Sequence, residues 1–228
     1  MPSPAEMQIL ATSFAVAWRA LVLALPFAIA VAFLLSRPGT PGRVLLDGLT
    51  HLPVILPPVL VGFLLLIIFG RRGPVGALLE QTLGVHLAFT TNGAALATAV
   101  MIFPLLVRSI RLAFEATDTR LFEAAAMLRA GPWDRFATIA LPLAGPGILA
   151  GMVTAFAAAM GEFGAVITFA ANIPGQTQTL PLAIYAVLQE PGGEAQAWRL
   201  ALISFTVAMC GLIAAEFLQR RARKRLAG

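Results

Sequence analysis

Two charged residues, Arg19 and Glu162, stand inside long apolar runs of this sequence and are the first candidates for chemistry. A charge placed near the centre of a bilayer costs about 2.5–3.5 kcal/mol on insertion scales, so such residues usually have a partner or a function. If the two runs cross a membrane in opposite directions, Arg19 and Glu162 come to similar depths in its outer half. We therefore predict an ion pair between them, within one subunit or between two.

Two alternatives to this pair stay open. Arg19 could line the path of a transported anion. Its long side chain could instead reach the outer surface, while Glu162 faces a wet outer mouth. Glu162 would repel an anion, so we do not expect it to bind an anionic substrate.

Other kinds of site lack the residues they need. His51 and His86 are too few and too scattered for a metal site, and Cys210, the one cysteine, cannot form a disulfide within the chain. The only lysine is Lys224, so the sequence contains no Gly-x-x-x-x-Gly-Lys-Ser/Thr phosphate loop. An intramembrane enzyme would need clustered His, Asp or Ser/Lys groups at depth. We expect no catalytic residue, no metal and no cofactor in this chain.

The composition indicates an all-α polytopic membrane protein. The chain is 59% hydrophobic and 12% charged, whereas a soluble domain has about 25% charged residues. Residues 1–228 are expected to form a single transmembrane domain. Pro53, Pro57 and Pro58 predict a break in its second span. Apolar stretches predict about five spans, at residues 9–35, 49–69, 93–113, 146–170 and 198–218.

The positive charges predict the orientation of these spans. Lysine and arginine favour the cytoplasmic side, and the basic tail 220–225 lies beyond the last span. With that tail inside, the outer side holds at most Arg71, Arg72 and Arg199. We predict the N-terminus outside and the C-terminus inside. The basic residues behind the net charge of +5 lie at the ends of apolar runs, so they indicate the orientation of the spans and not nucleic-acid binding. A cleaved signal peptide is the alternative for the first stretch, but its long apolar run and the lack of a positive side chain before it argue against that alternative.

A charged segment, residues 118–142, separates the third and fourth spans and is too polar to cross a bilayer. Asp118 can cap a helix that continues through residues 121–130. Gly131 is predicted to end this helix in the left-handed conformation, followed by Pro132. The predicted orientation places the segment in the cytoplasm.

This segment resembles the E-A-A–G–I-x-L-P loop of ATP-binding-cassette (ABC) importer permeases. The matching residues are Glu123-Ala124-Ala125, Gly131 six positions later, and Ile139-Ala140-Leu141-Pro142. In that family the loop is the coupling helix that docks in a cleft of the cytoplasmic ATPase. The resemblance implies the type I importer permease fold, with ATP and Mg²⁺ bound by the partner ATPase. It assigns ATPase coupling to Glu123, Ala124, Ala125, Leu128, Gly131, Leu141 and Pro142.

Six further stretches carry a second resemblance: residues 57–62, 70–73, 161–165, 172–177, 180–185 and 191–193. They are similar to the permease subunits of molybdate importers. The resemblance implies a multi-pass protein of the inner membrane that forms a homodimer, with two copies of an ATPase. It also implies an extracytoplasmic binding protein that delivers the oxyanion. Tungstate, or a related permease for sulfate or another oxyanion, stays open. A secondary transporter is a further alternative, although no internal repeat supports it.

Overall fold

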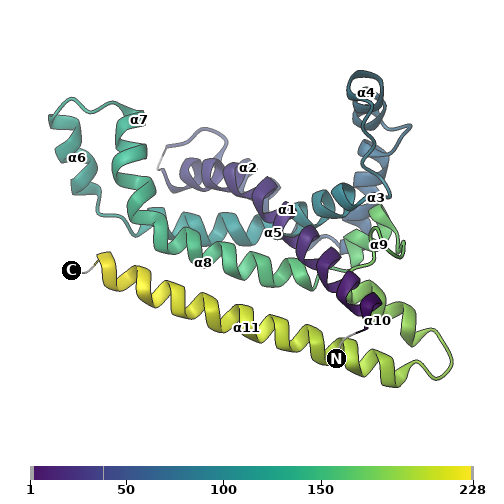
Figure 1. The fold of residues 1–228 in the computed structure, drawn as a ribbon. Helices are drawn as coiled ribbons and strands as arrows, with labels where there is room; N and C mark the ends of the chain where they lie inside the picture. The colour runs from purple at the N-terminus through teal and green to yellow at the C-terminus, as the bar shows by residue number, and fades with distance from the viewer. Residues whose placement is uncertain (1–2, 38, 227–228) are drawn as a thin grey trace.

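The structure is a computed structural model that describes residues 3–37 and 39–226. The described residues form helices joined by short turns and contain no strand (Figure 1). Most side chains from residue 212 onward, including those of the basic tail 220–225, lie outside this description. The helices are α1 (Pro4–Ser36), α2 (Arg43–Ile55), α3 (Pro58–Phe69), α4 (Pro74–Leu83), α5 (Thr91–Glu115), α6 (Thr119–Met127), α7 (Pro132–Arg135), the π-helical turn η1 (Phe136–Ala140), α8 (Leu141–Met160), α9 (Gly164–Ala170), α10 (Leu180–Leu188) and α11 (Glu194–Leu226).

Three helices of the described part are long and apolar enough to cross a membrane: α1, α5 and the continuous helix Pro132–Met160. The pair α2 and α3 makes a fourth candidate if it counts as one broken span, and its two axes are bent by 112°. This bend lies at Leu56 and Pro57, so the break expected from the prolines is present. The last helix, α11, has 33 residues, a length of about 50 Å.

The helix in the region of the predicted span 146–170 has different ends from that prediction. The helix begins at Pro132 and ends at Met160, and residues 161–163 separate it from α9. The π-helical turn η1 comes just before Pro142. Such a widened turn gives the proline ring more room against the preceding carbonyls, so the helix continues where the sequence suggested a loop.

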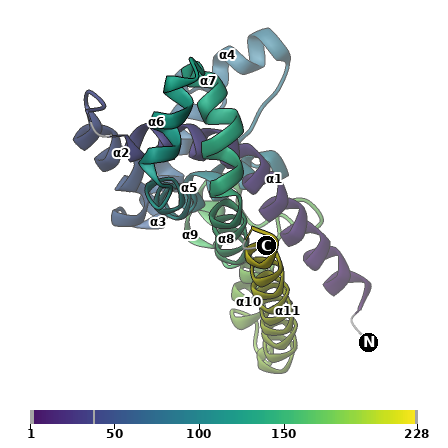
Figure 2. The ribbon, with the colours of Figure 1, turned by 90° about the vertical axis from the view of Figure 1, so that its left-hand side faces the viewer.

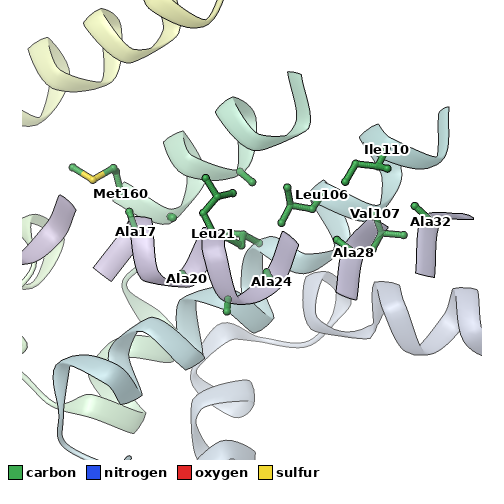
Figure 3. Packing of buried hydrophobic residues seen from close by; sticks show 14 of the residues in the cluster. Ala17, Ala20, Leu21, Ala24, Ala28, Ala32, Leu106, Val107, Ile110 and Met160 are labelled. Atoms are coloured by element: carbon green, nitrogen blue, oxygen red, sulfur yellow. The ribbon is translucent and has the colours of Figure 1, made fainter. Parts of the chain in front are cut away.

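The centre of the molecule is a contact between α1 and α5 (Figure 3). One face of α1 repeats alanine every three or four residues, and each of these alanines is at most 4% exposed. Small side chains let two helices approach closely, which is the usual basis of packing between helices in a membrane. The alanines of this face are Ala17, Ala20, Ala24, Ala28 and Ala32, and they pack near Leu106, Val107 and Ile110 of α5.

Glycines allow a close approach of α8 to α5. A Cβ atom added to Gly147 would lie 2.3 Å from the Cβ of Ala113 on α5. A Cβ added to Gly151 would lie 3.0 Å from the Cβ of Ser109. The Ser109 Oγ also donates a hydrogen bond to the carbonyl oxygen of Gly147, at 3.2 Å. The α5–α8 contact therefore depends on the missing side chain at Gly147.

The two ends of the helix bundle carry different parts of the chain. The start of α1 lies beside the start of α11, where the Arg199 Nη2 is 2.6 Å from the Glu6 Oε1. The hairpin formed by α6 and α7 lies at the opposite end, which is also the end toward which α11 runs (Figure 1). Figure 2 shows this hairpin from its own end of the molecule, with α6 and α7 next to each other.

Candidate functional site

The hairpin begins with a capped helix. The Asp118 side chain accepts a hydrogen bond from the backbone N–H of Arg120, at 2.9 Å, so the predicted N-cap is confirmed. Helix α6 has nine residues, a length of about 14 Å. It stops at Met127, three residues before the end that the sequence suggested.

The end of α6 corrects the prediction for Gly131. Arg129 takes the left-handed conformation, with φ 61°, and the N–H of Ala130 donates to the carbonyl oxygen of Ala125 at 3.0 Å. This hydrogen bond is typical of a Schellman ending, in which the left-handed residue directly follows the helix cap. Gly131 has φ −67° and ψ 165°, and its N–H donates to the Asp134 Oδ2 at 3.1 Å. It caps α7 in an extended conformation that any residue can adopt.

The tip of the hairpin exposes large apolar side chains. Met127 is 86% exposed and Leu128 is 84% exposed, and Trp133 on the return arm is 73% exposed. Such a group of apolar side chains, if it lies outside the bilayer, marks a contact with another protein.

The residues assigned to coupling divide between the hairpin and the helix that follows it. Leu141 and Pro142 belong to the continuous helix Pro132–Met160 and lie away from the tip. Of the set, Glu123, Ala124, Leu128 and Pro142 are exposed, while Ala125, Gly131 and Leu141 are half-buried.

A cleft of about 540 Å³ separates the hairpin from the ends of α1 and α5. Glu123 of α6 lines it, together with Glu115 at the end of α5. Arg37, which follows α1, and Arg135 of α7 line it as well. The hairpin thus rests on the bundle across a space bordered by two basic and two acidic side chains.

Aromatic rings connect the return arm of the hairpin to the bundle. The ring centroid of Phe136 lies 4.5 Å from that of Phe33 on α1, and the two rings meet edge to face. Phe33 also meets Phe114 of α5 edge to face at 5.4 Å, and Trp133 lies 5.4 Å from Phe136. Offset and edge-to-face pairs are the favoured arrangements of aromatic rings. A displacement of the return arm would therefore act directly on α1 and α5.

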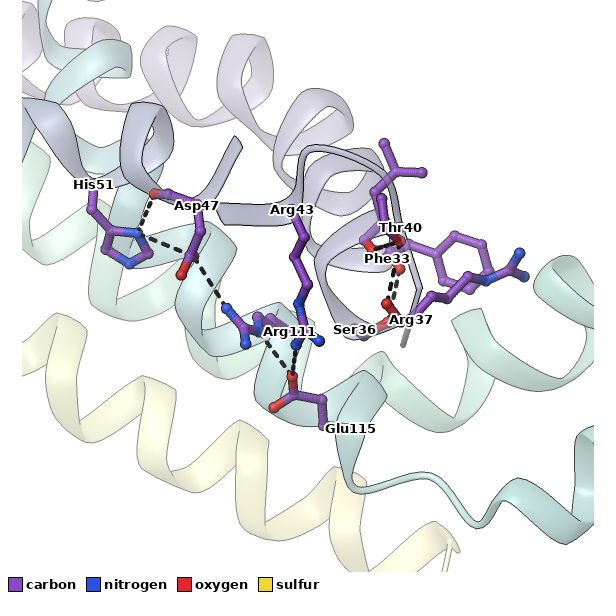
Figure 4. A network of polar contacts seen from close by, with 10 residues as sticks. Phe33, Ser36, Arg37, Thr40, Arg43, Asp47, His51, Arg111 and Glu115 are labelled. Atoms are coloured by element: carbon purple, nitrogen blue, oxygen red, sulfur yellow. Dashed lines mark hydrogen bonds and ion pairs between the residues drawn. The ribbon is translucent and has the colours of Figure 1, made fainter. Parts of the chain in front are cut away.

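An ionic network holds α2 against α5 near the same end (Figure 4). The Arg111 side chain contacts the Asp47 Oδ1 at 3.1 Å and the Glu115 Oε1 at 2.8 Å. Arg43 lies 3.6 Å from that Glu115 oxygen, and His51 lies 3.4 Å from the Asp47 carboxylate. Sequence reasoning missed this network, although the four-residue spacing of Arg111 and Glu115 on one helix is a signal that could have revealed part of it.

Arg19 and Glu162 do not form the predicted pair within the chain. The Arg19 Nη1 donates to the Asn92 Oδ1 at the start of α5, at 3.1 Å. The Glu162 Oε1 accepts from the backbone N–H of Ala165, at 3.0 Å, and so caps α9. Among the ion pairs of the described residues none joins Arg19 to Glu162. The helix break after Met160 leaves N–H groups that the carboxylate satisfies locally. A pair between two subunits stays a prediction.

The start of α9 packs against the start of α3. A Cβ added to Gly164 would lie 2.6 Å from the Cβ of Pro58, and one added to Gly62 would lie 2.6 Å from the carbonyl oxygen of Ala165. Two stretches that are far apart in the sequence, residues 57–62 and 161–165, therefore pack in direct backbone contact.

Comparison with known proteins identifies the family. Residues 24–224 match the family described as "Binding-protein-dependent transport system inner membrane component". The chain belongs to this family. It is accordingly a multi-pass protein of the inner membrane and a transport subunit.

Relatives of known description extend over nearly the whole chain. The sequence is 51% identical over 220 residues to "Molybdenum transport system permease protein ModB" of Escherichia coli (strain K12), covering 96% of each chain. It is 46% identical over 221 residues to the protein of the same name from Haemophilus influenzae, covering 97% of this chain and 96% of that one. It is 39% identical over 169 residues to "Sulfate permease 2, chloroplastic" of Chlamydomonas reinhardtii, covering 74% of this chain and 46% of that one.

Solved structures share the fold. A chain of the "bacterial alginate ABC transporter in complex with alginate pentasaccharide-bound periplasmic protein" matches with a TM-score of 0.76 at 16% identity, covering 96% of this chain and 80% of that one. A chain of the "MetNI methionine ABC transporter" matches with a TM-score of 0.71 at 14% identity, covering 97% and 99%. The protein therefore has the fold of ABC importer permeases.

Proposed function

We propose that this chain is the transmembrane permease of an ATP-driven importer for molybdate. The observation that carries the proposal is the 51% identity to the Escherichia coli molybdenum permease over 96% of both chains. The sulfate permease of Chlamydomonas reinhardtii is less similar and matches over 46% of its own length. Molybdate is therefore favoured over sulfate, and tungstate belongs to the same proposal because it is a similar tetrahedral dianion.

The proposed orientation has the N-terminus outside, five spans with α2 and α3 as one broken span, and the C-terminus in the cytoplasm. Two observations support it. Lysine and arginine are enriched on the cytoplasmic side of membrane proteins, which places the basic tail in the cytoplasm. The α6–α7 hairpin and the N-terminal end of α1 lie at opposite ends of the bundle (Figure 1).

In this orientation the hairpin docks on a cytoplasmic ATPase subunit, which binds ATP and Mg²⁺. The exposed Met127 and Leu128 supply apolar contact area, and Glu123 supplies a polar contact. Ala124 and Ala125 are small, so the ATPase surface can approach the α6 backbone closely. The permease contributes no catalytic residue, and its role is to convert movement of the ATPase into movement of its spans.

The path of that movement follows the packing of the hairpin. Pro132–Met160 is one continuous helix, so a displacement at α7 is carried into the span formed by α8. The contact between Phe136 and Phe33 carries the same displacement to α1. ATP binding and hydrolysis can shift the balance between inward-open and outward-open states only through different affinities for the two states. The permease senses this difference in affinity through the docked hairpin, because the hairpin is its contact with the ATPase.

The transport path lies between two copies of the chain, and an extracytoplasmic binding protein delivers the oxyanion to it. Arg19 is the only basic residue within a predicted span core. Backbone N–H groups, hydroxyl groups and water therefore carry the anion, with selectivity supplied by the binding protein.

Vesicles that contain the permease and its ATPase test the proposal. ATP is enclosed inside, the binding protein is added outside, and uptake of molybdate and of sulfate is measured. We expect molybdate uptake that requires ATP, the ATPase and the binding protein. Uptake by the permease without the ATPase would favour a secondary transporter, and a preference for sulfate would favour the related oxyanion permease.

A further inference from the structure

An apolar groove runs along the bundle beside the hairpin. It is a cavity of about 670 Å³ between α1 and the helix that returns from the hairpin. Pro26 and Leu34 mark its extent along α1, and Phe136 and Leu141 line the opposite wall. Pro26 and Leu34 are eight positions apart on the helix, which is about 12 Å. The groove is thus nearly as long as one bilayer leaflet is thick, since a whole hydrocarbon core measures about 30 Å.

Basic side chains stand where the groove reaches the hairpin. Phe33, Arg37 and Pro132 line both this groove and the cleft under the hairpin, so the two spaces adjoin at these residues. The Arg37 guanidinium carbon lies 4.1 Å from the centroid of the Phe33 ring, and Figure 4 shows the side chain extending beyond the end of α1. Arg135 lines the same cleft from α7.

We propose that the groove binds an anionic phospholipid of the cytoplasmic leaflet. One acyl chain lies between α1 and the return arm formed by α7 and η1, and the headgroup phosphate lies at Arg37 and Arg135. An apolar channel with basic residues at its cytoplasmic end is the arrangement that recognises anionic headgroups between membrane helices. Trp133, which also lines the groove and is 73% exposed, has the amphipathic ring that favours the level of the headgroups.

The cleft also contains two acidic side chains. Glu115 and Glu123 line it together with Arg37 and Arg135, and the Glu115 carboxylate is paired with Arg111 at 2.8 Å. The bound lipid would contact Phe33 and Phe136, the two rings that join the hairpin to α1. It would therefore influence how firmly the hairpin is held against the bundle. The assignment to the cytoplasmic leaflet rests on the proposed orientation, whereas the binding itself does not.

Quenching of Trp133 fluorescence by brominated lipid tests the proposal on the full chain. Trp18 and Trp198 are replaced by phenylalanine, and the protein is placed in nanodiscs of phosphatidylcholine. A small fraction of lipid with brominated chains is added, as phosphatidylglycerol or as phosphatidylcholine. We expect brominated phosphatidylglycerol to quench Trp133 several-fold more effectively. The double variant Arg37→Gln, Arg135→Gln should reduce that quenching to the level of phosphatidylcholine.

The control is Arg120→Gln, which removes a charge from the exposed surface of the same hairpin but lines neither cavity. It should keep the preference for phosphatidylglycerol. Ala30→Phe, which places a ring in the groove while keeping both arginines, should reduce quenching by both lipids. Equal quenching by the two lipids in the parent protein would overturn the proposal. So would a loss of the phosphatidylglycerol preference in Arg120→Gln as large as that in the double variant. Because neither ATPase nor molybdate is present, this outcome is independent of whether the protein imports molybdate.

Discussion

The ring of Phe136 meets the ring of Phe33 edge to face, with their centroids 4.5 Å apart. Phe136 belongs to the π-helical turn η1 on the return arm of the hairpin, and Phe33 lies near the end of α1. This contact joins the segment proposed to dock on the ATPase to a helix of the central packing. It is the shortest of the aromatic contacts in the cluster that contains Phe114 and Trp133.

Phe136→Ala should weaken coupling between ATP hydrolysis and transport. Removing the ring deletes the contact with Phe33, and an aromatic pair contributes about 0.5–1.5 kcal/mol beyond its buried area. The ATPase should still bind, because the exposed tip of the hairpin is unchanged. We expect the ratio of molybdate imported to ATP hydrolysed to fall several-fold in vesicles. Leu143→Ala, at an exposed position of α8, is the control, and an equal fall in that variant would contradict the account.

Met127→Asp and Leu128→Asp should prevent assembly with the ATPase. Both side chains are more than 80% exposed at the hairpin tip, so neither substitution should unfold the permease. We expect the ATPase to be lost from the purified complex while the permease keeps its helical circular dichroism. Leu83→Asp, on α4 outside the hairpin, changes a 68% exposed leucine in the same way and should leave the complex intact. Retention of the ATPase by both hairpin variants would place the docking surface elsewhere.

Gly147→Ala should destabilise the packing of α5 on α8. The new Cβ would lie 2.3 Å from the Cβ of Ala113, so one helix must move. Overpacking of this kind typically costs about 1–3 kcal/mol. Thermal unfolding in detergent should show a lower midpoint. The matched control is Gly145→Ala, because a Cβ there meets nothing within 4 Å. Its greater helix propensity should make it neutral or stabilising by up to about 1 kcal/mol, and equal midpoints for the two variants would refute the close contact.

Arg129→Gly should stabilise the end of α6, and Gly131→Ala should be tolerated. Arg129 has φ 61°, where glycine is favoured over other residues by roughly 1 kcal/mol. At Gly131, φ is −67°, and the nearest atom to an added Cβ is the Asp134 Oδ2 at 3.3 Å. Hydrogen exchange of the α6 amides should slow in Arg129→Gly and stay nearly unchanged in Gly131→Ala. Faster exchange in Arg129→Gly would contradict the helix ending described here.

Local signals in the sequence predicted several of these features correctly. Asp118 is the cap of α6 because a carboxylate before a helix finds free N–H groups nearby, whatever the rest of the chain does. Pro57 lies at the break between α2 and α3, because proline donates no hydrogen bond to a helix. The apolar composition and the loop motif were sufficient to predict the family.

Features that depend on packing could not be predicted from the sequence. Pro142 lies inside a helix because the π-helical turn before it accommodates the ring. The left-handed residue is Arg129 and not Gly131, because the hydrogen bonds at the end of α6 decide which residue follows the cap. Arg19 contacts Asn92, a partner 73 residues away that no spacing rule connects with it.

We propose that the hairpin lies in the cytoplasm and is covered by the ATPase, and cysteine labelling at its tip tests both statements. Leu128→Cys is introduced in a Cys210→Ser background, which removes the only native cysteine. A membrane-impermeant maleimide is applied to intact cells and to inverted membrane vesicles. We expect the maleimide to label the cysteine at position 128 in inverted vesicles alone, and we expect added ATPase to protect it strongly. Labelling from the outside of intact cells, or labelling that the ATPase does not change, would contradict the proposal.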